Sequence, residues 1–165
     1  MKAIVAVTAD WAIGKDNKLL LSIPEDMRFF RETTGGGTLI MGRKTLESFP
    51  GGNPLKGRIN IVITRDEDYA KEGAIIVHSP EEALSRAAGY TDRECFVIGG
   101  ESIYRQMIGH CDMAYVTKAD VTADADAFFP DLDNDKSWKV SACSEEKEYE
   151  GVRYRFVTYV NILRA

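Results

Sequence analysis

The fold of this chain is most constrained by short apolar runs that alternate with amphipathic segments. The apolar runs occupy residues 3–7, 38–41, 59–63, 74–77, 95–98 and 113–118. The amphipathic segments between them, with helical spacing, occupy residues 24–34, 43–48, 80–88 and 101–108. Continuous apolar runs are typical of strands that are buried on both faces. The alternation therefore predicts a mainly parallel α/β sheet with helices on both faces.

The last part of the chain has a different pattern. Polar residues alternate there with Val152, Tyr154, Phe156, Thr158, Val160 and Ile162. The dipeptide Glu150-Gly151 separates this run from residues 138–148. Alternating strands joined by a glycine turn are typical of an antiparallel hairpin. We therefore expect a C-terminal hairpin at one edge of the sheet, and ligands at the carboxyl ends of the parallel strands.

The composition limits the domain organisation and the partners. A chain of 165 residues with 44% hydrophobic residues can bury one core, so we expect a single domain spanning residues 1–165. No apolar run reaches the roughly 18 residues of a membrane span and no signal-like segment is found, which favours a cytoplasmic protein without a membrane partner. A net charge of -5 argues against nucleic acid as the main partner. The cysteines, Cys95, Cys111 and Cys143, lack CxxC spacing, which indicates reduced thiols.

One carboxylate in the first predicted helix lies where an apolar residue is expected. The apolar stripe of this helix consists of Ile23, Met27, Phe30 and Thr34, and we expect it to be the buried face. At about 100° per residue, Asp26 falls inside the arc of this stripe, whereas Glu25 points away from it. Ser22 and Glu25 have the spacing of a capping box at the helix start. Because a buried carboxylate is costly, Asp26 requires a chemical explanation.

A glycine pair marks a first possible phosphate site. In FVIGGESIY, residues 96–104, an apolar strand ends at Gly99-Gly100 and a helix follows at once. Bare backbone and a helix N-terminus then face the same side, which suits a pyrophosphate. A tight structural turn explains the dipeptide about equally well.

Further donors and cations follow other strands. In TLIMGRKTLES, residues 38–48, a strand ends at Gly42 and the next helix opens with Arg43, Lys44 and Thr45. Cations are unfavourable at a helix start unless an anion is bound there. Thr64-Arg65 and His78 end the two strands that come next along the chain. Because these ends should share one edge of the sheet, they favour an extended polyanion such as NADPH.

Two other classes of protein share some of these features. Gly37 to Thr45 reads GxxxxGRKT, close to the phosphate loop of nucleotide kinases, but an Arg precedes the Lys and residues 38–41 form a predicted strand, whose amides cannot cradle phosphates. A module that binds a nucleotide without chemistry is the second alternative, and Asp26 argues against it. No GxGxxG, GxSxG or metal-ligand motif occurs, so neither a Rossmann fold, a catalytic triad nor a bound metal is expected.

Six blocks of the sequence resemble bacterial dihydrofolate reductase in order and spacing. They are residues 3–34, TLIMGRKTLES, Gly57-Arg58, FVIGGESIY, YVTKAD and DADAFFPD. The resemblance spans residue 3 to about residue 160 and implies an eight-stranded, mainly parallel mixed sheet with four helices, in agreement with the predicted elements. It also implies reduction of 7,8-dihydrofolate to tetrahydrofolate, with a hydride passing from NADPH to pterin C6 and a proton reaching N5. A monomer that also binds antifolate inhibitors is expected.

The resemblance further implies a role for each matching residue. Asp26 matches the catalytic carboxylate, which accepts hydrogen bonds from the pterin, and Arg58 matches the residue that grips the substrate's glutamate tail. The implied substrate-binding residues are Val5, Asp26, Met27, Phe30, Leu55, Arg58, Ile98 and Thr117. The implied cofactor-binding residues are Ala6, Ile13, Gly14, Gly42, Arg43, Lys44, Thr45, Thr64, Arg65, His78, Gly99, Gly100, Glu101, Ser102, Ile103 and Tyr104. Taken without the family, Val5, Ala6, Ile13, Gly14 and Ile98 would be core or turn residues.

Four further expectations follow from the resemblance. Apolar neighbours should raise the pKa of Asp26 through desolvation, and Thr117 should donate a hydrogen bond to it. Residues 9–22 resemble the mobile loop that closes over the nicotinamide, and Gly99-Gly100 resembles a cis peptide of the family. One departure is Leu20-Leu21, where the family commonly has Pro-Trp, because leucine lacks the indole N–H that helps to hold a water near the substrate. Leu46 likewise replaces a common Trp.

Overall fold

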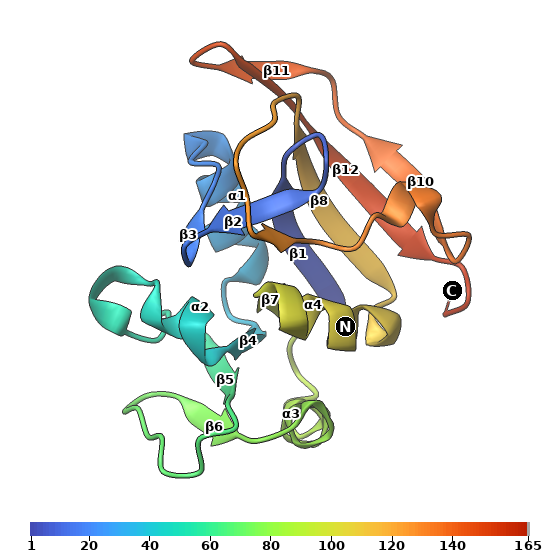
Figure 1. The fold of residues 1–165 in the computed structure, drawn as a ribbon. Helices are drawn as coiled ribbons and strands as arrows, with labels where there is room; N and C mark the ends of the chain where they lie inside the picture. Colours follow the sequence, from blue (N-terminus) through green and yellow to red (C-terminus); the bar gives the residue numbers. More distant parts are fainter. Residues whose placement is uncertain (165) are drawn as a thin grey trace.

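The computed structural model of the chain describes residues 1–164, which are arranged around one large sheet (Figure 1). Eight strands follow in the order β10-β12-β8-β1-β7-β4-β5-β6. Their bounds are Lys2–Val7 (β1), Thr38–Gly42 (β4), Ile59–Ile63 (β5), Ile75–Val77 (β6), Cys95–Gly99 (β7), Met113–Ala119 (β8), Trp138–Cys143 (β10) and Val152–Asn161 (β12). The short strand β11 (Lys147–Tyr149) pairs with the first half of β12 and β10 with the second half, so both occupy the same edge. The predicted eight-stranded sheet is confirmed.

The pairing of the strands is parallel in the centre and antiparallel at one edge, as predicted. Strands β1 and β4 to β8 pair in parallel, whereas β12 runs antiparallel to β8, β10 and β11. In β12 the buried residues change face along the strand: Tyr154 is buried near its start, and Val157 and Tyr159 further on. The reason is that Phe156 packs against Phe29 of the first helix, while Tyr159 packs against Trp11 on the opposite face.

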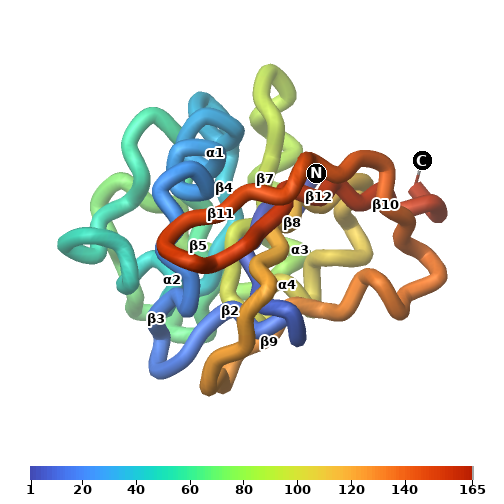
Figure 2. Tube along the Cα trace, turned by 90° about the horizontal axis from the view of Figure 1, so that it is seen from above, coloured from blue at the N-terminus to red at the C-terminus, as the bar shows by residue number. Residues whose placement is uncertain are grey.

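Four helices cover both faces of the sheet (Figures 1 and 2). They are α1 (Pro24–Thr34), α2 (Arg43–Glu47), α3 (Pro80–Ala88) and α4 (Glu101–Met107). On one face, Phe29 of α1 and Leu46 of α2 pack with Met41 of β4. On the other face, Ala83 of α3 and Met107 of α4 belong to the same core cluster as Ile40. Because successive strand residues point to opposite faces, Ile40 and Met41 anchor different layers.

The parallel strands bring their carboxyl ends to one edge of the sheet. Gly42 of β4 lies beside Ile63 of β5, and Ile63 lies beside Val77 of β6. On the other side of β4, Met41 lies beside Gly99 of β7. These strands are followed directly by Arg43, Thr64, His78 and Gly100. The strand ends that carry the predicted donors are therefore neighbours.

The start of α1 differs from the prediction. The capping box of Ser22 and Glu25 is wrong, because Ile23 is the N-cap residue and no side chain caps the helix. Pro24 supplies the start instead, since its fixed φ angle suits the first helical position. The Ser22 hydroxyl lies 3.9 Å from the sulfur of Met27, and the Glu25 carboxylate reaches the sheet.

Residues 9–22, expected to be a loop, contain two short strands. These are β2 (Ala12–Lys15) and β3 (Lys18–Leu19), which form a small second sheet with β9 (Ala127–Phe128). A Cβ atom on Gly14 would lie 3.1 Å from the carbonyl oxygen of Lys18, so the close approach of β2 and β3 favours glycine there.

The remaining elements are short turns of 3-10 helix at Pro50–Gly52, Ile108–His110 and Leu132–Asn134. The turn at Ile108–His110 continues α4, which ends one residue earlier than predicted, as does α2.

No helix within residues 1–164 is long and apolar enough to cross a membrane. Cys95, Cys111 and Cys143 are all free thiols.

Candidate active site

Asp26 lies in the first turn of α1 and faces β8. Its Oδ1 accepts a hydrogen bond of 2.6 Å from the hydroxyl of Thr117, a residue that is 2% exposed. Burial raises the pKa of Asp26 above its usual range, while the bond from Thr117 acts in the opposite direction. A half-buried carboxyl group of this kind retains its proton to higher pH than an exposed one, as proton-transfer chemistry near neutral pH requires.

The apolar residues expected around Asp26 divide into two groups. One group consists of Phe30, Leu55 and Ile98, which pack against the core cluster that contains Met41 and Leu46. Met27, by contrast, is 50% exposed, so its assignment to the buried stripe is wrong. Phe29 packs on the sheet instead, with its ring edge-on to Tyr115 at 5.9 Å. The helix is therefore turned so that Asp26 and Phe29, one turn apart, both face the sheet.

Arg58 precedes β5 and lies beside the C-terminal end of α1. Its Nη1 donates to the Thr34 hydroxyl at 3.2 Å and its Nε to the Lys56 carbonyl at 3.0 Å. Burial, and then the nearby charge of Arg31, lower the pKa of Arg58. Within residues 1–164 no carboxylate forms an ion pair with Arg58. Two neighbouring cations without an acidic partner are suited to an anionic ligand.

Asn60, which no sequence motif indicated, fixes the segment that carries Leu55 and Arg58. Asn60 is 2% exposed and lies in β5. Its side chain bonds the amide and the carbonyl of Leu55 at 3.0 and 2.9 Å and the carbonyl of Arg58 at 3.1 Å. A polar residue inside the apolar run INIVI was the available signal, since a buried amide requires partners.

The turn between β7 and α4 lies against the start of α2. The Gly99-Gly100 peptide bond is cis, and Gly99 has a φ of 135°, which side chains rarely adopt. A Cβ atom at Gly99 would lie 3.3 Å from the Thr45 hydroxyl oxygen, and one at Gly100 would lie 3.6 Å from it. A Cβ atom at Gly42 would lie 3.2 Å from the side chain of Ile103. The tight spacing at Gly42 and Gly99 thus favours glycine where α2 and α4 begin side by side, whereas the distance at Gly100 is an ordinary contact.

Three of the first four side chains of α4 serve the protein interior. Tyr104 is 3% exposed, and its hydroxyl donates to the carbonyl of Ile4 at 2.7 Å. Ile103 is buried, and the Glu101 carboxylate accepts from the amide of Phe128 at 2.6 Å. The hydroxyl of Ser102 accepts from the next turn of its own helix. A ligand at this end of α4 would therefore meet backbone N–H groups and the exposed Ser102 rather than the side chains of Ile103 and Tyr104.

Arg43 is held by three neighbours that the sequence analysis did not identify. Its Nη1 lies 3.2 Å from Asp66, its Nε lies 3.3 Å from Glu47, and its guanidinium stacks 4.2 Å from the ring centre of Tyr69. Asp66 and Tyr69 lie between β5 and β6, in a segment without a sequence motif. The guanidinium is therefore fixed at the carboxyl edge of the sheet before any ligand binds.

The other predicted cofactor residues at this edge lie next to one another. The Nδ1 atom of His78 is 2.9 Å from the carbonyl oxygen of Thr64. Neither Lys44 nor Arg65 forms an ion pair with another residue of the described chain. The structure thus brings Arg43, Thr64 and His78 together, and leaves two further cations free for an anion.

Residues 9–22, which the sequence predicted to be a mobile loop, are attached to the rest of the protein at several points. Ile13 and Gly14 belong to β2, and the Leu20 amide donates to the Ile13 carbonyl at 3.3 Å. The side-chain amide of Asn17 reaches the carbonyl of Lys44 at 3.3 Å. Leu21 packs beside a buried cluster formed by Ile23, Ala119 and Tyr154.

Val5 and Ala6 lie in β1 next to Val116 and Thr117 of β8.

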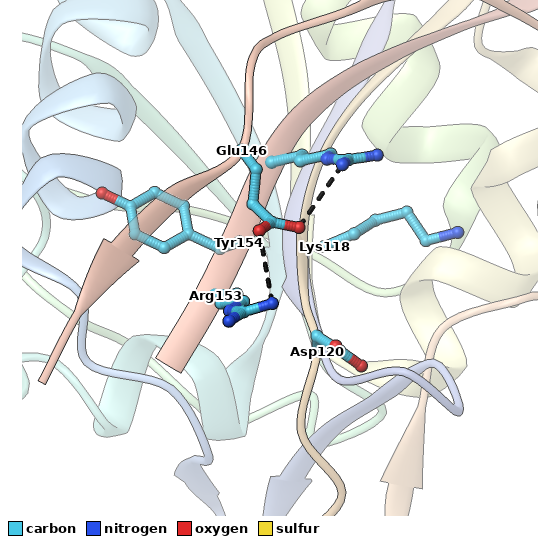
Figure 3. A pocket seen from close by; sticks show the side chains of 6 residues that line it. Lys118, Asp120, Glu146, Arg153 and Tyr154 are labelled. Carbon is cyan, nitrogen blue, oxygen red and sulfur yellow. Dashed lines mark hydrogen bonds and ion pairs between the residues drawn. The ribbon is translucent and has the colours of Figure 1, made fainter. Parts of the chain in front are cut away.

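A separate surface pocket lies between β8 and β12 (Figure 3). It is lined by Lys118, Asp120, Glu146, Arg153, Tyr154 and Arg155. Lys118 follows Thr117 in β8, so its side chain points to the face opposite Asp26. Glu146 pairs with Arg153 at 3.7 Å and with Arg155 at 3.3 Å. Two of its three cations thus pair with the same carboxylate, and the pocket contains none of the predicted site residues.

Comparison with known proteins identifies the family. Residues 1–161 match the family described as dihydrofolate reductase. The dihydrofolate reductase of Bacillus subtilis is 37% identical over 158 residues, 94% of this chain and 91% of the relative. The enzyme of the same name from Neisseria gonorrhoeae is 40% identical over 158 residues, 95% of each protein. The solved structure of dihydrofolate reductase from Enterococcus faecalis complexed with NADP(H) and RAB-propyl has a TM-score of 0.86 and 35% identity, covering 96% of this chain and 94% of that chain. The chain belongs to the dihydrofolate reductase family.

Proposed function

We propose that Asp26 is the catalytic carboxylate of this chain, a dihydrofolate reductase that uses NADPH to reduce 7,8-dihydrofolate to tetrahydrofolate. The observation that carries the proposal is the half-buried carboxylate of Asp26, held at 2.6 Å by Thr117 on the strand beside β1. Its two oxygens can accept a planar pair of hydrogen bonds from the pterin 2-amino group and N3. Because its pKa is raised, it also supports proton delivery to N5, which we expect to pass through a water since N5 lies across the ring.

The substrate would extend from Asp26 along α1 toward Arg58. Phe30, Leu55 and Ile98 supply an apolar surface for the pterin and the ring that follows it. The guanidinium of Arg58, which has no acidic partner within residues 1–164, would bind the α-carboxylate of the glutamate tail. We assign to Val5, Met27 and Thr117 the remaining contacts with the substrate.

The cofactor would lie across the carboxyl ends of β7, β4, β5 and β6. When bound, NADPH supplies the hydride that reduces C6. We propose that Thr45 and the Gly99-Gly100 turn hold its ribose and pyrophosphate through a hydroxyl and backbone N–H groups. The 2′-phosphate would meet a cluster of cations and polar groups that consists of Arg43, Lys44, Thr64, Arg65 and His78. Ala6, Ile13 and Gly14 would border the nicotinamide.

The test is a spectrophotometric assay of NADPH oxidation with and without dihydrofolate. The wild-type protein should oxidise NADPH only when dihydrofolate is present. Asp26→Asn should lose at least about 10²-fold in kcat at pH 7, a typical contribution of a general acid. Glu32→Gln, which removes an exposed carboxylate of the same helix, is the matched control and should keep wild-type activity. Near-full activity of Asp26→Asn would contradict the proposal.

We also propose that residues 1–165 form a single domain that acts as a monomer in the cytoplasm and is inhibited by antifolates. The proposal rests on the sequence composition and on a family match that spans residues 1–161 without interruption. Analytical ultracentrifugation of the purified chain tests the oligomeric state, because a monomer should sediment at 18.4 kDa. Sedimentation at twice that mass would contradict it.

A further inference from the structure

Glu25, the residue next to Asp26, is attached to the C-terminal strands. Its Oε2 accepts a hydrogen bond of 2.8 Å from the hydroxyl of Tyr154, and its Oε1 lies 3.2 Å from Nζ of Lys147. Figure 2 shows the turn between β11 and β12 passing over α1, as these contacts require. The bond from Tyr154 is the largest factor that lowers the pKa of Glu25, so Glu25 binds its partners as a carboxylate.

Tyr154 is the more firmly held of the two partners. Its ring is 4% exposed and packs with Ile23 and Ala119, and Leu21 lies against the same cluster. In Figure 3 the ring points away from Lys118, to the side of the sheet that carries α1. A hydrogen bond from the hydroxyl of a packed tyrosine to a carboxylate is stronger and better oriented than an exposed ion pair. The position of Glu25 is therefore set mainly by Tyr154.

The two consecutive carboxylates of α1 are held by neighbouring positions of one strand pair. Tyr154 pairs with Ala119 between β12 and β8, and two residues further along β12, Phe156 pairs with Thr117. Thr117 donates to Asp26 on the same side of the sheet on which Tyr154 donates to Glu25. The helix start has no side-chain N-cap, so in the described chain these hydroxyl groups attach the first turn of α1 to the sheet.

This attachment bears directly on the chemistry of Asp26. A catalytic carboxylate must be held within about 0.5 Å of its productive position by the groups around it. The peptide that joins Glu25 to Asp26 transmits any displacement of the first turn to the Asp26 carboxylate. In the segment that precedes the helix, Leu20 and Leu21 donate no side-chain hydrogen bond, and the Ser22 hydroxyl reaches only the sulfur of Met27, at 3.9 Å. This segment therefore adds no side-chain hydrogen bond from the first turn to the sheet.

We propose that Glu25, held by Tyr154 and Lys147, is a positioning residue that sets the geometry of the Asp26 carboxylate. This inference rests on the proposed catalytic role of Asp26. Glu25 itself touches neither the substrate nor the cofactor. Loss of its contacts therefore lowers kcat, while the affinity for NADPH, which binds at the other strand ends, stays the same.

The experiment compares steady-state kinetics and NADPH affinity in four variants. Tyr154→Phe keeps the buried ring and removes only the donor, so kcat should fall by about fivefold. Glu25→Ala also removes the contact with Lys147, so its kcat should fall at least as far as that of Tyr154→Phe. The double variant should fall no further than Glu25→Ala, because Glu25→Ala already removes the contact with Tyr154. Glu25→Gln keeps an acceptor for Tyr154 and should stay within about twofold of wild type.

Glu32→Ala, at an exposed position of the same helix, is the matched control and should behave as wild type. The NADPH dissociation constant should be unchanged in Tyr154→Phe. An unchanged kcat in both Tyr154→Phe and Glu25→Ala would overturn the inference. A loss of NADPH affinity that equals the loss of kcat would also overturn it, because that pattern indicates general destabilisation.

Tyr154→Phe in an Asp26→Asn background separates this inference from the proposed function. If Glu25 acts through Asp26, adding Tyr154→Phe to Asp26→Asn should leave kcat where Asp26→Asn alone puts it. A further fivefold loss would show that Tyr154 acts by another route and would overturn the positioning role. Near-full activity of Asp26→Asn alone would instead refute the catalytic role of Asp26, whatever the effect of Tyr154→Phe in the wild-type background.

Discussion

The hydroxyl of Thr117 donates a 2.6 Å hydrogen bond to the carboxylate of Asp26 across 91 positions of sequence. The bond joins the first turn of α1 to the centre of the sheet and holds the carboxylate at a half-buried position. It favours the ionised form of Asp26, whereas burial favours the protonated form more strongly. The balance leaves an acid with a raised pKa beside the carboxyl ends of the parallel strands.

The activity of Asp26→Asn should depend on pH differently from that of the wild type. At low pH the solvent can protonate the substrate without an enzyme group, so the rate of the variant should continue to rise as the pH falls. The wild-type rate should level off below the raised pKa of Asp26. Profiles of kcat from pH 5 to pH 9 test this, and parallel profiles for the two proteins would exclude a proton-transfer role.

The stability of the same variant should change in the opposite direction to its activity. Because the pKa of Asp26 is higher in the folded than in the unfolded chain, ionisation of Asp26 destabilises the fold as the pH rises above the unfolded value. Asparagine removes this penalty and can still accept from Thr117. Near pH 7 the melting temperature of Asp26→Asn should therefore equal or exceed that of wild type, and the difference should disappear in acid. Unfolding of the variant at pH 7 would identify Asp26 as a structural residue.

Arg58→Ala should weaken substrate binding more than it slows the reaction. The guanidinium lies at the far end of α1 from Asp26, so it contributes binding energy rather than help at the reacting atoms. KM for dihydrofolate should rise by at least about tenfold, as expected for a lost ionic hydrogen bond. A pterin substrate without the glutamate tail should show no change, and an equal loss with both substrates would indicate a structural role.

The cations at the ends of β4, β5 and β6 should make the enzyme prefer NADPH to NADH. We expect a preference of at least about tenfold in kcat/KM, or ~1.4 kcal/mol. Arg65→Ala should reduce it, and Arg65 is a better test than Arg43, whose removal would leave Asp66 and Glu47 unpaired beside the phosphate. Lys139→Ala, an exposed cation of β10, serves as the control. Equal use of both cofactors by the wild-type protein would contradict the assignment.

The sequence by itself determined the order of the elements and the family. Buried strands are continuous apolar runs, and glycine or proline marks their ends, so local composition sufficed for the six parallel strands and for α1 and α3. The short strands β2, β3 and β9 were not predicted, because two to four residues carry too little pattern to distinguish them from a loop.

Only the tertiary structure decided which side chains meet. The stripe of α1 predicted Met27 as buried, but packing of Phe29 on Tyr115 and Phe156 turned the helix and left Met27 half exposed. Asn60 and the pairing of Glu25 with Tyr154 connect residues whose spacing in sequence carries no periodic signal. Hydrophobic periodicity specifies which face of an element is buried, whereas hydrogen-bond partners depend on the register and rotation of elements that the chain brings together only on folding.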